Sequence, residues 1–301
     1  MKIAIIGTGI AGNVAAYKLR DDHDITVFEA NNYVGGHTHT HDIKVGDMSY
    51  KVDTGFIVFN EWTYPNFLSL LNELNVVAQP SDMSFSVKCQ RSSLEYNGTS
   101  LNSLFAQRSN LIKPSFYRMI SDILRFNKAA KMFLTTGDTT MKLGEYLYQC
   151  RYSKEFIEHY IIPMGAAIWS ADPVQMFEFP AFFFMRFFNN HGMLSVGERP
   201  QWYVVKGGSN AYVDRLISGH KDNIYLNSPV KAIRRKREFV DVILSDGDVR
   251  RFDYVFLACH SDQALRMLER PSQIEKAVLG AIPYQKNEVV LHTDESVLPK
   301  K

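Results

Sequence analysis

Two short apolar runs near the N-terminus are separated by a glycine-rich turn and an alanine-rich stretch. The first run, Lys2 to Ile6 (KIAII), is nearly continuous and rich in β-branched residues, which is typical of a strand buried on both faces. Residues 7–12 (GTGIAG) and a helical pattern through Leu19 follow, and the second run is Ile25 to Phe28 (ITVF). This order predicts a strand, a tight turn, a helix and a second strand, the unit from which parallel α/β sheets are built.

Further strand patterns occur later in the chain. The turn at Gly46-Asp47 and the alternation that leads to Asp53 predict a hairpin. Other strand-like runs are Trp202 to Val205, Ile224 to Leu226, Val240 to Leu244, Tyr254 to Leu257 and Glu288 to His292. Asp246-Gly247 is expected to form a turn between the runs at 240–244 and 254–257.

The middle of the chain has helical spacing instead. Apolar residues recur at this spacing from Tyr64 to Leu74 and over most of 114–168. We therefore predict an α/β fold in which a Rossmann-like domain is interrupted by a mainly helical domain. The predicted boundaries are 1–60 and 203–282 for the first domain, and 61–202 and 283–301 for the second.

Composition narrows the class of protein. The 301 residues are 46% hydrophobic and 22% charged, with a formal net charge of +2, so a globular protein is indicated and a nucleic-acid partner is not. The three cysteines are far apart in the sequence, which suits reduced thiols in a cytoplasmic protein. The N-terminus resembles no signal peptide, and no apolar run of about 18 residues predicts a transmembrane helix.

The glycine turn has the spacing of a dinucleotide-binding motif. Gly7 permits the tight turn, Gly9 lets the backbone approach a diphosphate, and Gly12 allows close packing of helix and strand. Ile10 and Ala11 lie at the helix N-terminus, whose free N–H groups favour phosphate. Glu29 ends the second strand, where a carboxylate can bind unphosphorylated ribose, which disfavours NADP but leaves NAD and FAD open.

Three histidines, His37, His39 and His41, follow in the stretch GGHTHTHD. On an extended chain, side chains two positions apart share one face at roughly 7 Å, so these imidazoles could hold a metal ion. The alternative is that the histidines belong to a cofactor-binding loop and to the hairpin behind it.

The segment 29–38 (EANNYVGGHT) favours the second interpretation, because it resembles the second fingerprint of the flavin-containing amine oxidase and phytoene desaturase-like superfamily. That fingerprint reads Glu-Ala-x-x-Arg-x-Gly-Gly-Arg, and here Tyr33 and His37 stand where arginines are usual. The resemblance implies that FAD is bound by Glu29, Ala30, Gly35, Gly36, His37 and Thr38. It leaves His39 and His41 as hairpin residues, so no metal site is expected.

The likeness extends along most of the chain. Residues 53–56 (DTGF) resemble a segment that passes the flavin, which implies roles for Gly55 and Phe56, and 206–209 (KGGS) resemble a glycine pair before a helix. Residues 224–233 resemble the strand whose valine backbone contacts adenine, here Val230, and 255–259 a strand that leads back to the cofactor. The nearest subgroup is that of bacterial predicted NAD/FAD-binding amine oxidase-like proteins, which share TYPN at 63–66. Because such relatives carry a further C-terminal part, a shortened chain is expected.

The resemblance implies an FAD-dependent oxidoreductase that transfers a hydride from a C–N or C–C bond of a small molecule to the flavin. No catalytic residue is assigned. The candidate pocket residues are Phe56, Ile57, Asn60, Trp169, Tyr203 and Lys206. A non-catalytic dinucleotide-binding or interaction protein is the alternative, and an NAD dehydrogenase is a third.

The phenylalanine-rich segment 178–188 (EFPAFFFMRFF) bears on the substrate. One interpretation is a helix buried in the core of the interrupting domain. The other is the wall of an apolar channel near a membrane surface. The second would favour an apolar or lipid-like substrate and peripheral membrane contact.

Overall fold

The computed structural model describes residues 1–195, 197 and 199–299. The chain divides into two compact units. Unit 1 contains Met1–Val58, Asn66–Pro80 and Tyr203–Glu288, and unit 2 contains Phe59–Pro65, Ser81–Trp202 and Val289–Lys301. Within the described part of the chain, no helix is long and apolar enough to cross a membrane.

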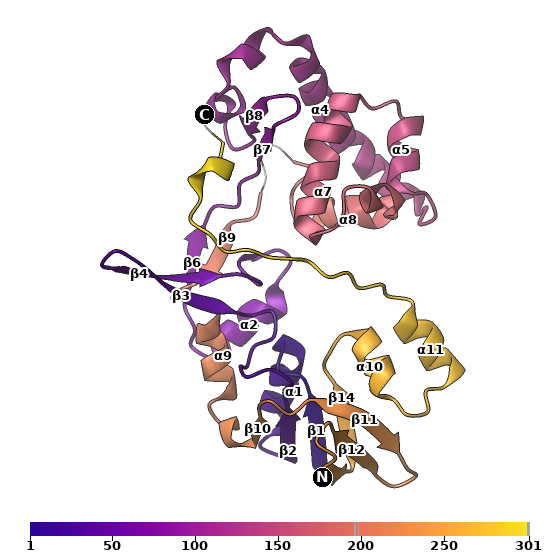
Figure 1. The fold of residues 1–301 in the computed structure, drawn as a ribbon. Coiled ribbons are helices and arrows are strands. Elements are labelled where there is room, and N and C mark those ends of the chain that lie inside the picture. The colour runs from indigo at the N-terminus through magenta and orange to yellow at the C-terminus, as the bar shows by residue number, and fades with distance from the viewer. Residues whose placement is uncertain (196, 198, 300–301) are drawn as a thin grey trace. The chain divides into compact units, whose positions relative to one another are not determined.

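Unit 1 is built on a parallel sheet (Figure 1). Its strands, in spatial order, are β10 (Ile224–Tyr225), β2 (Asp24–Phe28), β1 (Lys2–Ile6) and β14 (Tyr254–Leu257). Helix α1 (Ile10–Leu19) connects β1 to β2, and every neighbouring pair is parallel. The predicted strand, turn, helix and strand are therefore confirmed.

Both faces of this sheet are covered, which explains the continuous apolar run in β1. Ile3 and Ile5 pack on one face with Ala16 of α1, whereas Ala4 and Ile6 pack on the other. The second face is covered by the antiparallel strands β11 (Val230–Arg235), β12 (Val240–Leu244) and β13 (Val249–Phe252). Unit 1 thus has a helix, a parallel sheet and an antiparallel sheet in successive layers.

The remaining elements of unit 1 complete its surface. The hairpin of β3 (Thr40–Val45) and β4 (Met48–Asp53) turns at Gly46, where φ is +60°, as the sequence predicts. The helices are α2 (Pro65–Glu73), α9 (Asn210–Ile217), α10 (Ser261–Met267) and α11 (Gln273–Gly280). Most of β6 (Ala78–Ser81) and β9 (Trp202–Val205) belongs to unit 1, whereas β5 (Phe59–Asn60) belongs to unit 2.

Unit 2 is mainly helical, as predicted for the middle of the chain. Its helices are α3 (Leu101–Leu104), α4 (Pro114–Thr136), α5 (Leu143–Gln149), α6 (Lys154–Phe156), α7 (Ile162–Trp169) and α8 (Ala181–Asn190), with a π-helical turn at Ile157–Ile161. The hairpin of β7 (Ser86–Cys89) and β8 (Leu94–Asn97) packs on the same apolar core. Phe184 and Phe188 of α8 are buried in this core. This agrees with the interpretation of the phenylalanine-rich segment as a helix buried in the interrupting domain.

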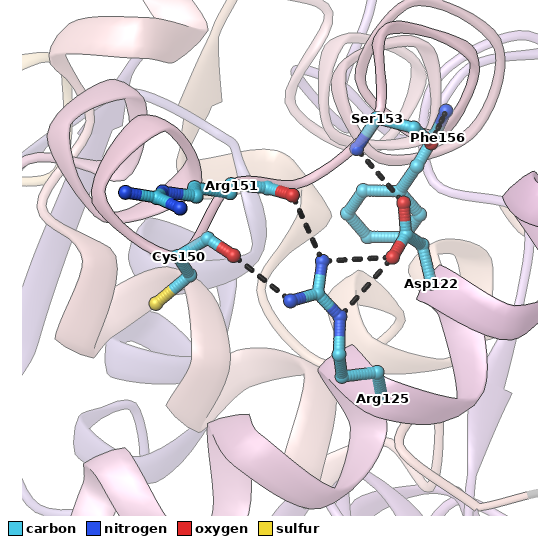
Figure 2. A network of polar contacts seen from close by, with 6 residues as sticks. All are labelled: Asp122, Arg125, Cys150, Arg151, Ser153 and Phe156. Carbon is cyan, nitrogen blue, oxygen red and sulfur yellow. Dashed lines mark hydrogen bonds and ion pairs between the residues drawn. The ribbon is translucent and has the colours of Figure 1, made fainter.

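A polar network joins α4 to the turn between α5 and α6 (Figure 2). The Arg125 guanidinium donates to Asp122 Oδ1 at 2.8 Å and to the carbonyl oxygens of Cys150 and Arg151 at 2.9 and 3.1 Å. Asp122 Oδ2 accepts from the Ser153 N–H at 2.8 Å. These hydrogen bonds with Ser153 and Arg125 lower the pKa of the buried Asp122 carboxyl, although burial opposes the shift.

Two expectations about strands are wrong, and one further strand was missed. Residues 288–292 form no strand, since they lie exposed with no neighbouring strand to pair with. The Asp246-Gly247 turn connects β12 to β13, and β13 was not predicted because its sequence, VRRF, carries two arginines on a short edge strand. Residues 224–233 form β10 and β11 in different sheets, with Asn227 at a φ of +50° between them.

The units differ from the predicted domain boundaries mainly at α2. Contacts within the chain place Asn66–Pro80 in unit 1, whereas the sequence pattern assigns this segment to the helical domain. The reason is that Leu70 and Leu71 are buried, and neighbours such as Tyr212, whose ring packs edge-on against Phe67, belong to unit 1. Of the predicted segment 283–301, residues 300 and 301 lie outside the described residues. The domain boundaries themselves stay a prediction.

Candidate functional site

A cavity of about 620 Å³ opens at the carboxyl ends of β1, β2 and β14 in unit 1. This is the edge of a parallel α/β sheet at which ligands usually bind, because the loops that follow the strands converge there. The walls come from the glycine turn after β1, the end of β2, the second glycine segment, the start of β11 and the start of α10. The lining residues used below are Thr8, Gly9, Glu29, Ala30, Tyr33, Gly36, His37, Val230, Lys231, Cys259, His260 and Arg266.

The three glycines of the first turn have different surroundings. Gly7 has a φ of +103°, and a Cβ atom there would lie 2.6 Å from the Ala258 carbonyl oxygen. A Cβ atom on Gly12 would lie 1.9 Å from the Gly7 carbonyl oxygen. At Gly9, by contrast, no atom lies within 4 Å of the Cβ position. Gly7 and Gly12 are therefore required by the packing of the fold, whereas Gly9 leaves open space at the cavity wall.

The second glycine segment lies directly against the first. Gly36 has a φ of +61°, and its Cβ position is 3.0 Å from the Gly9 Cα atom. Gly35 has a φ of +128°, and its N–H donates to the Thr8 carbonyl oxygen at 3.1 Å. The two segments thus form a continuous wall of bare backbone, which a bulky polar ligand can approach closely.

Glu29 is buried at the end of β2, with a relative exposure of 6%. Its carboxylate accepts from the Thr8 N–H and the Asn31 N–H, each at 2.9 Å, and from the Thr8 hydroxyl. A carboxylate offers about four acceptor positions, so one position is left for a further donor such as a ribose hydroxyl. Thr8 therefore connects Glu29 to Gly35, and this residue was missed in the sequence because it occupies a variable position of the motif.

The N-terminus of α1 also points to an anionic ligand. Gly9 is the N-cap, no side chain caps the helix, and the first turn has no acidic residue. The first N–H groups of a helix lack partners within it and carry a partial positive charge. Ile10 and Ala11, which supply two of these groups, are exposed. This helix end is complementary to a phosphate group.

Charged side chains on the remaining walls were not predicted. Lys231 and Arg266 line the cavity, and Arg266 Nη1 donates to Asp262 at 2.7 Å. Cys259 lines it as well, and burial raises the pKa of its thiol. The strand-like run at 255–259 could have indicated these residues. The residues that follow a parallel strand reach the same sheet edge as the glycine turn, and β14 is parallel to β1.

The three histidines do not share one role. His37 is exposed and lines the cavity. His39 stacks between the rings of Tyr33 and His41, with centroid distances of 4.4 and 4.1 Å, and His41 Nε2 lies 3.2 Å from the Thr54 hydroxyl. Among the described residues, no group of three or more His, Cys, Asp or Glu side chains could hold a metal ion.

The segments around Thr38 and Gly55 lie behind the cavity wall and support it. Gly55 approaches His37 so closely that a Cβ atom would lie 1.9 Å from the His37 carbonyl oxygen. The buried Thr38 hydroxyl is hydrogen-bonded to the Tyr212 hydroxyl at 2.5 Å, and the Phe56 ring packs edge-on against Phe67. Neither Gly55, Phe56 nor Thr38 is among the residues that line this cavity.

Asp53, the first residue of the DTGF segment, holds the helix after the KGGS segment. Both carboxylate oxygens of Asp53 accept from the Ser209 N–H at 3.0 Å, and one also accepts from the Ser209 hydroxyl. The Thr40 hydroxyl donates to Asp53 and accepts from the Asn210 N–H. These two motifs therefore join the hairpin to α9.

The candidate pocket residues are not brought to this cavity. Asn60 and Trp169 belong to unit 2, where Asn60 Oδ1 accepts from two backbone N–H groups of its own turn and Trp169 packs on phenylalanine rings. In unit 1, Ile57 is exposed, Tyr203 lies in β9, and the backbone N–H of Lys206 donates to Val77. Their proposed contact with substrate stays a prediction.

Solved structures of two amine oxidases are similar to this chain. Cyclohexylamine oxidase from Brevibacterium oxydans IH-35A superposes with a TM-score of 0.70 at 18% identity, covering 93% of this chain and 62% of the oxidase. An engineered putrescine oxidase gives a TM-score of 0.67, also at 18% identity, with coverages of 93% and 62%. The present chain thus spans less than two thirds of either oxidase, and the likeness supports the α/β fold predicted from the sequence.

Sequence comparisons agree with this fold. Tryptophan 2-monooxygenase from Allorhizobium ampelinum is 45% identical over 60 residues, which is 19% of this chain and 8% of the monooxygenase. The family model described as flavin containing amine oxidoreductase matches residues 10–299. The predicted resemblance, and with it the expected flavin cofactor of the family, is confirmed. The chain belongs to the family of flavin containing amine oxidoreductases.

Proposed function

We propose that this protein binds FAD in the unit 1 cavity and acts as an oxidoreductase of the amine oxidase type. The observation that carries the proposal is the wall formed by Gly9 and Gly36, which lies beside the free N-terminus of α1 and the buried Glu29. These groups complement the diphosphate and ribose of a dinucleotide. The family match identifies the dinucleotide as a flavin cofactor rather than NAD.

The described residues fit such a group. The backbone of Gly9 and Gly36 and the first turn of α1, which includes Ile10 and Ala11, would hold the diphosphate. Glu29, with one acceptor position free, would bind the ribose. Ala30 and Val230 line the cavity beyond Glu29, where the adenine would lie. A cavity of about 620 Å³ is within the usual range for a cofactor site.

When bound, the flavin supplies the chemistry, because its ring system accepts the hydride that leaves a C–N or C–C bond. The protein residues named above bind and orient the cofactor. Thr38, Gly55 and Phe56 keep the second glycine segment in place through contacts behind the wall. These residues therefore fix the position of the cofactor-binding backbone, and we assign no proton transfer to them.

The substrate is proposed to be an apolar amine. Two similar structures are named as oxidases of cyclohexylamine and putrescine, and another, at a TM-score of 0.53, as a fatty acid isomerase from P. acnes. In unit 2, Phe183 of α8 is 43% exposed, while Phe184 and Phe188 are buried. The exposed ring supports an apolar binding surface on α8. The contacts of Asn60, Trp169, Tyr203 and Lys206 with substrate stay predictions. The cytoplasmic location and any peripheral membrane contact stay predictions.

Reconstitution tests the proposal. The purified chain is incubated with FAD, and bound flavin is measured by absorption after gel filtration. Thermal protection by FAD is compared with that by NAD, because the ligand that binds the native state more tightly raises the Tm further. Cyclohexylamine, putrescine and long-chain amines are then added without oxygen, and loss of flavin absorption reports hydride transfer.

Three results have distinct meanings. Bound FAD that is reduced by an amine supports the whole proposal. Bound FAD that no amine reduces would favour the alternative of a non-catalytic dinucleotide-binding protein. Protection by NAD but not by FAD would refute the proposal in favour of a dehydrogenase.

A further inference from the structure

Two histidines from distant parts of the sequence face one another across the edge of the cavity. The ring centroids of His37 and His260 are 5.6 Å apart, and the ring planes differ by 26°. Both side chains line the cavity and both residues are exposed to solvent. His37 follows Gly36 directly, so the imidazole pair lies next to the bare backbone wall that Gly9 and Gly36 form.

Neighbouring groups hold both histidines in place. The Tyr284 ring stacks on the His260 ring at a centroid distance of 4.4 Å and an angle of 8°, and the Tyr284 hydroxyl accepts from the Ser261 N–H at 3.0 Å. The His260 N–H donates to Gln263 at 3.2 Å, and the His37 carbonyl accepts from the Phe56 N–H at 3.2 Å. The two hydrogen bonds fix the backbone at His37 and His260, and the stacking on Tyr284 limits the side-chain freedom that His260 would lose on binding.

The permanent charges of the cavity include few cations that could balance an anionic ligand, so the imidazoles can contribute to this balance. Glu29 contributes a negative charge to the wall, and Arg266 is engaged by Asp262 at 2.7 Å. Lys231 is the other permanent cation among the lining residues. A dinucleotide diphosphate carries about two negative charges, so protonated imidazoles beside the glycine wall would complement it.

We propose that His37 and His260 form a paired imidazole clamp on the diphosphate of the bound dinucleotide, held in place by Tyr284, and that the clamp makes cofactor affinity depend on pH. The inference rests on the proposed function, because it names residues of the same site. His260 becomes a cofactor-binding residue and Tyr284 a positioning residue. The charge of an imidazole changes between about pH 5 and pH 8, so the clamp binds more tightly on the acidic side.

Other titratable or charged groups surround the pair. Those that line the same cavity are Glu29, Tyr33, Lys231, Cys259 and Arg266, and those in contact with these groups or with the pair are His39, Asp262 and Tyr284. Burial raises the pKa of the Cys259 thiol, so that thiol stays neutral between about pH 5 and pH 8. His39 is the one further imidazole among the groups just named, and it is stacked on Tyr33.

The test is the dissociation constant of FAD, measured by flavin fluorescence at about pH 6 and about pH 8. FAD is a suitable probe because both of its phosphates are esterified and keep their charge over this range. The wild-type constant is expected to be about fivefold or more lower at the acidic pH, the effect of one unit charge about 4 Å from a phosphate in water. His37→Gln and His260→Gln should each reduce this ratio, and the double variant should remove it.

His41→Gln is the matched control, because His41 contacts Thr54 in the hairpin and does not line the cavity. It should keep the wild-type ratio. Tyr284→Leu should weaken FAD binding at about pH 6 more than at about pH 8, an effect that a purely structural role of Tyr284 would not produce. Thermal unfolding without FAD checks that each variant folds.

Two outcomes overturn the inference in different ways. Equal FAD affinity at both pH values in the wild type, or an unchanged ratio in His260→Gln, refutes the clamp while the proposed function stands. A wild-type chain that binds no FAD at either pH refutes the proposed function and the clamp together.

Discussion

Gly9→Ala should separate cofactor binding from folding, because Gly9 is the glycine of the first turn whose Cβ position is open. Its φ of −65° and ψ of 179° are accessible to alanine, and no atom lies within 4 Å of the added methyl group. Replacing glycine reduces the freedom of the unfolded chain, which stabilises a protein by about 0.4–1 kcal/mol, but Gly9 is the N-cap of α1 and alanine is a poorer N-cap than glycine by a similar amount, so the two effects nearly cancel. At about 2–4 °C per kcal/mol, the Tm should stay within about 2 °C of the wild-type value.

Gly12→Ala is the matched comparison, and it should clearly lower the stability. Alanine gains about 1 kcal/mol of helix propensity, but its Cβ atom would lie 1.9 Å from the Gly7 carbonyl oxygen. A backbone atom cannot rotate out of the way, so the overpacking cost of about 1–3 kcal/mol or more exceeds the gain. The Tm of Gly12→Ala should fall by several degrees, about 2–4 °C for each kcal/mol lost.

Cofactor affinity gives the second measurement. The methyl group of Gly9→Ala would occupy the space that a diphosphate needs, so the dissociation constant of FAD should rise about tenfold or more, equivalent to about 1.4 kcal/mol. Tm without ligand and FAD titration are measured on the same preparations. The reasoning is refuted if Gly9→Ala lowers the Tm as Gly12→Ala does, or if it binds FAD as tightly as the wild type.

Two further variants test interactions away from the cofactor wall. Asp122→Asn should destabilise the protein by about 1–3 kcal/mol in thermal unfolding, because the Ser153 N–H and the Arg125 guanidinium lose a charged acceptor (Figure 2). The Asp122 pKa is lowered in the folded state, so the loss should shrink as the pH falls through that pKa; a loss that persists in acid would contradict the charge argument. His220 is 3% exposed, and neither of its ring nitrogens has a hydrogen-bond partner among the described residues. Burial together with the Arg20 guanidinium lowers its pKa. The unfolded state then binds more protons, so stability should decline as the pH falls below about 6.5, and His220→Phe should flatten the decline in denaturant titrations; an unchanged profile would exclude His220 as the cause.

Local signals explain why the first part of the site was predictable. The three glycines of the first turn and the apolar runs on either side all lie within about thirty residues of the sequence. The structure forms β1, α1 and β2 there as expected. Each glycine has a steric reason that can be stated before the structure is known. The hairpin turn at Gly46 was predictable for the same reason.

The rest of the site depends on which strands become neighbours. His260 reaches His37 because β14 pairs with β1 in parallel, and this pairing joins residues that are far apart in sequence. Periodicity reports which residues are buried, but it does not report strand order. For the same reason the apolar run at 288–292 was mistaken for a strand, since a strand also requires a partner.

The position of the cavity separates two parts of the proposed activity. Every residue that lines it belongs to unit 1, whereas Asn60 and Trp169 belong to unit 2. Trp169 is packed against Phe179, Phe184 and Phe187 at centroid distances of 4.8–5.5 Å, so its replacement by a smaller residue acts first on the core of unit 2. The cavity is therefore formed by unit 1 alone, and a change in FAD affinity that follows a substitution in its wall can be traced to unit 1 without reference to the proposed substrate contacts.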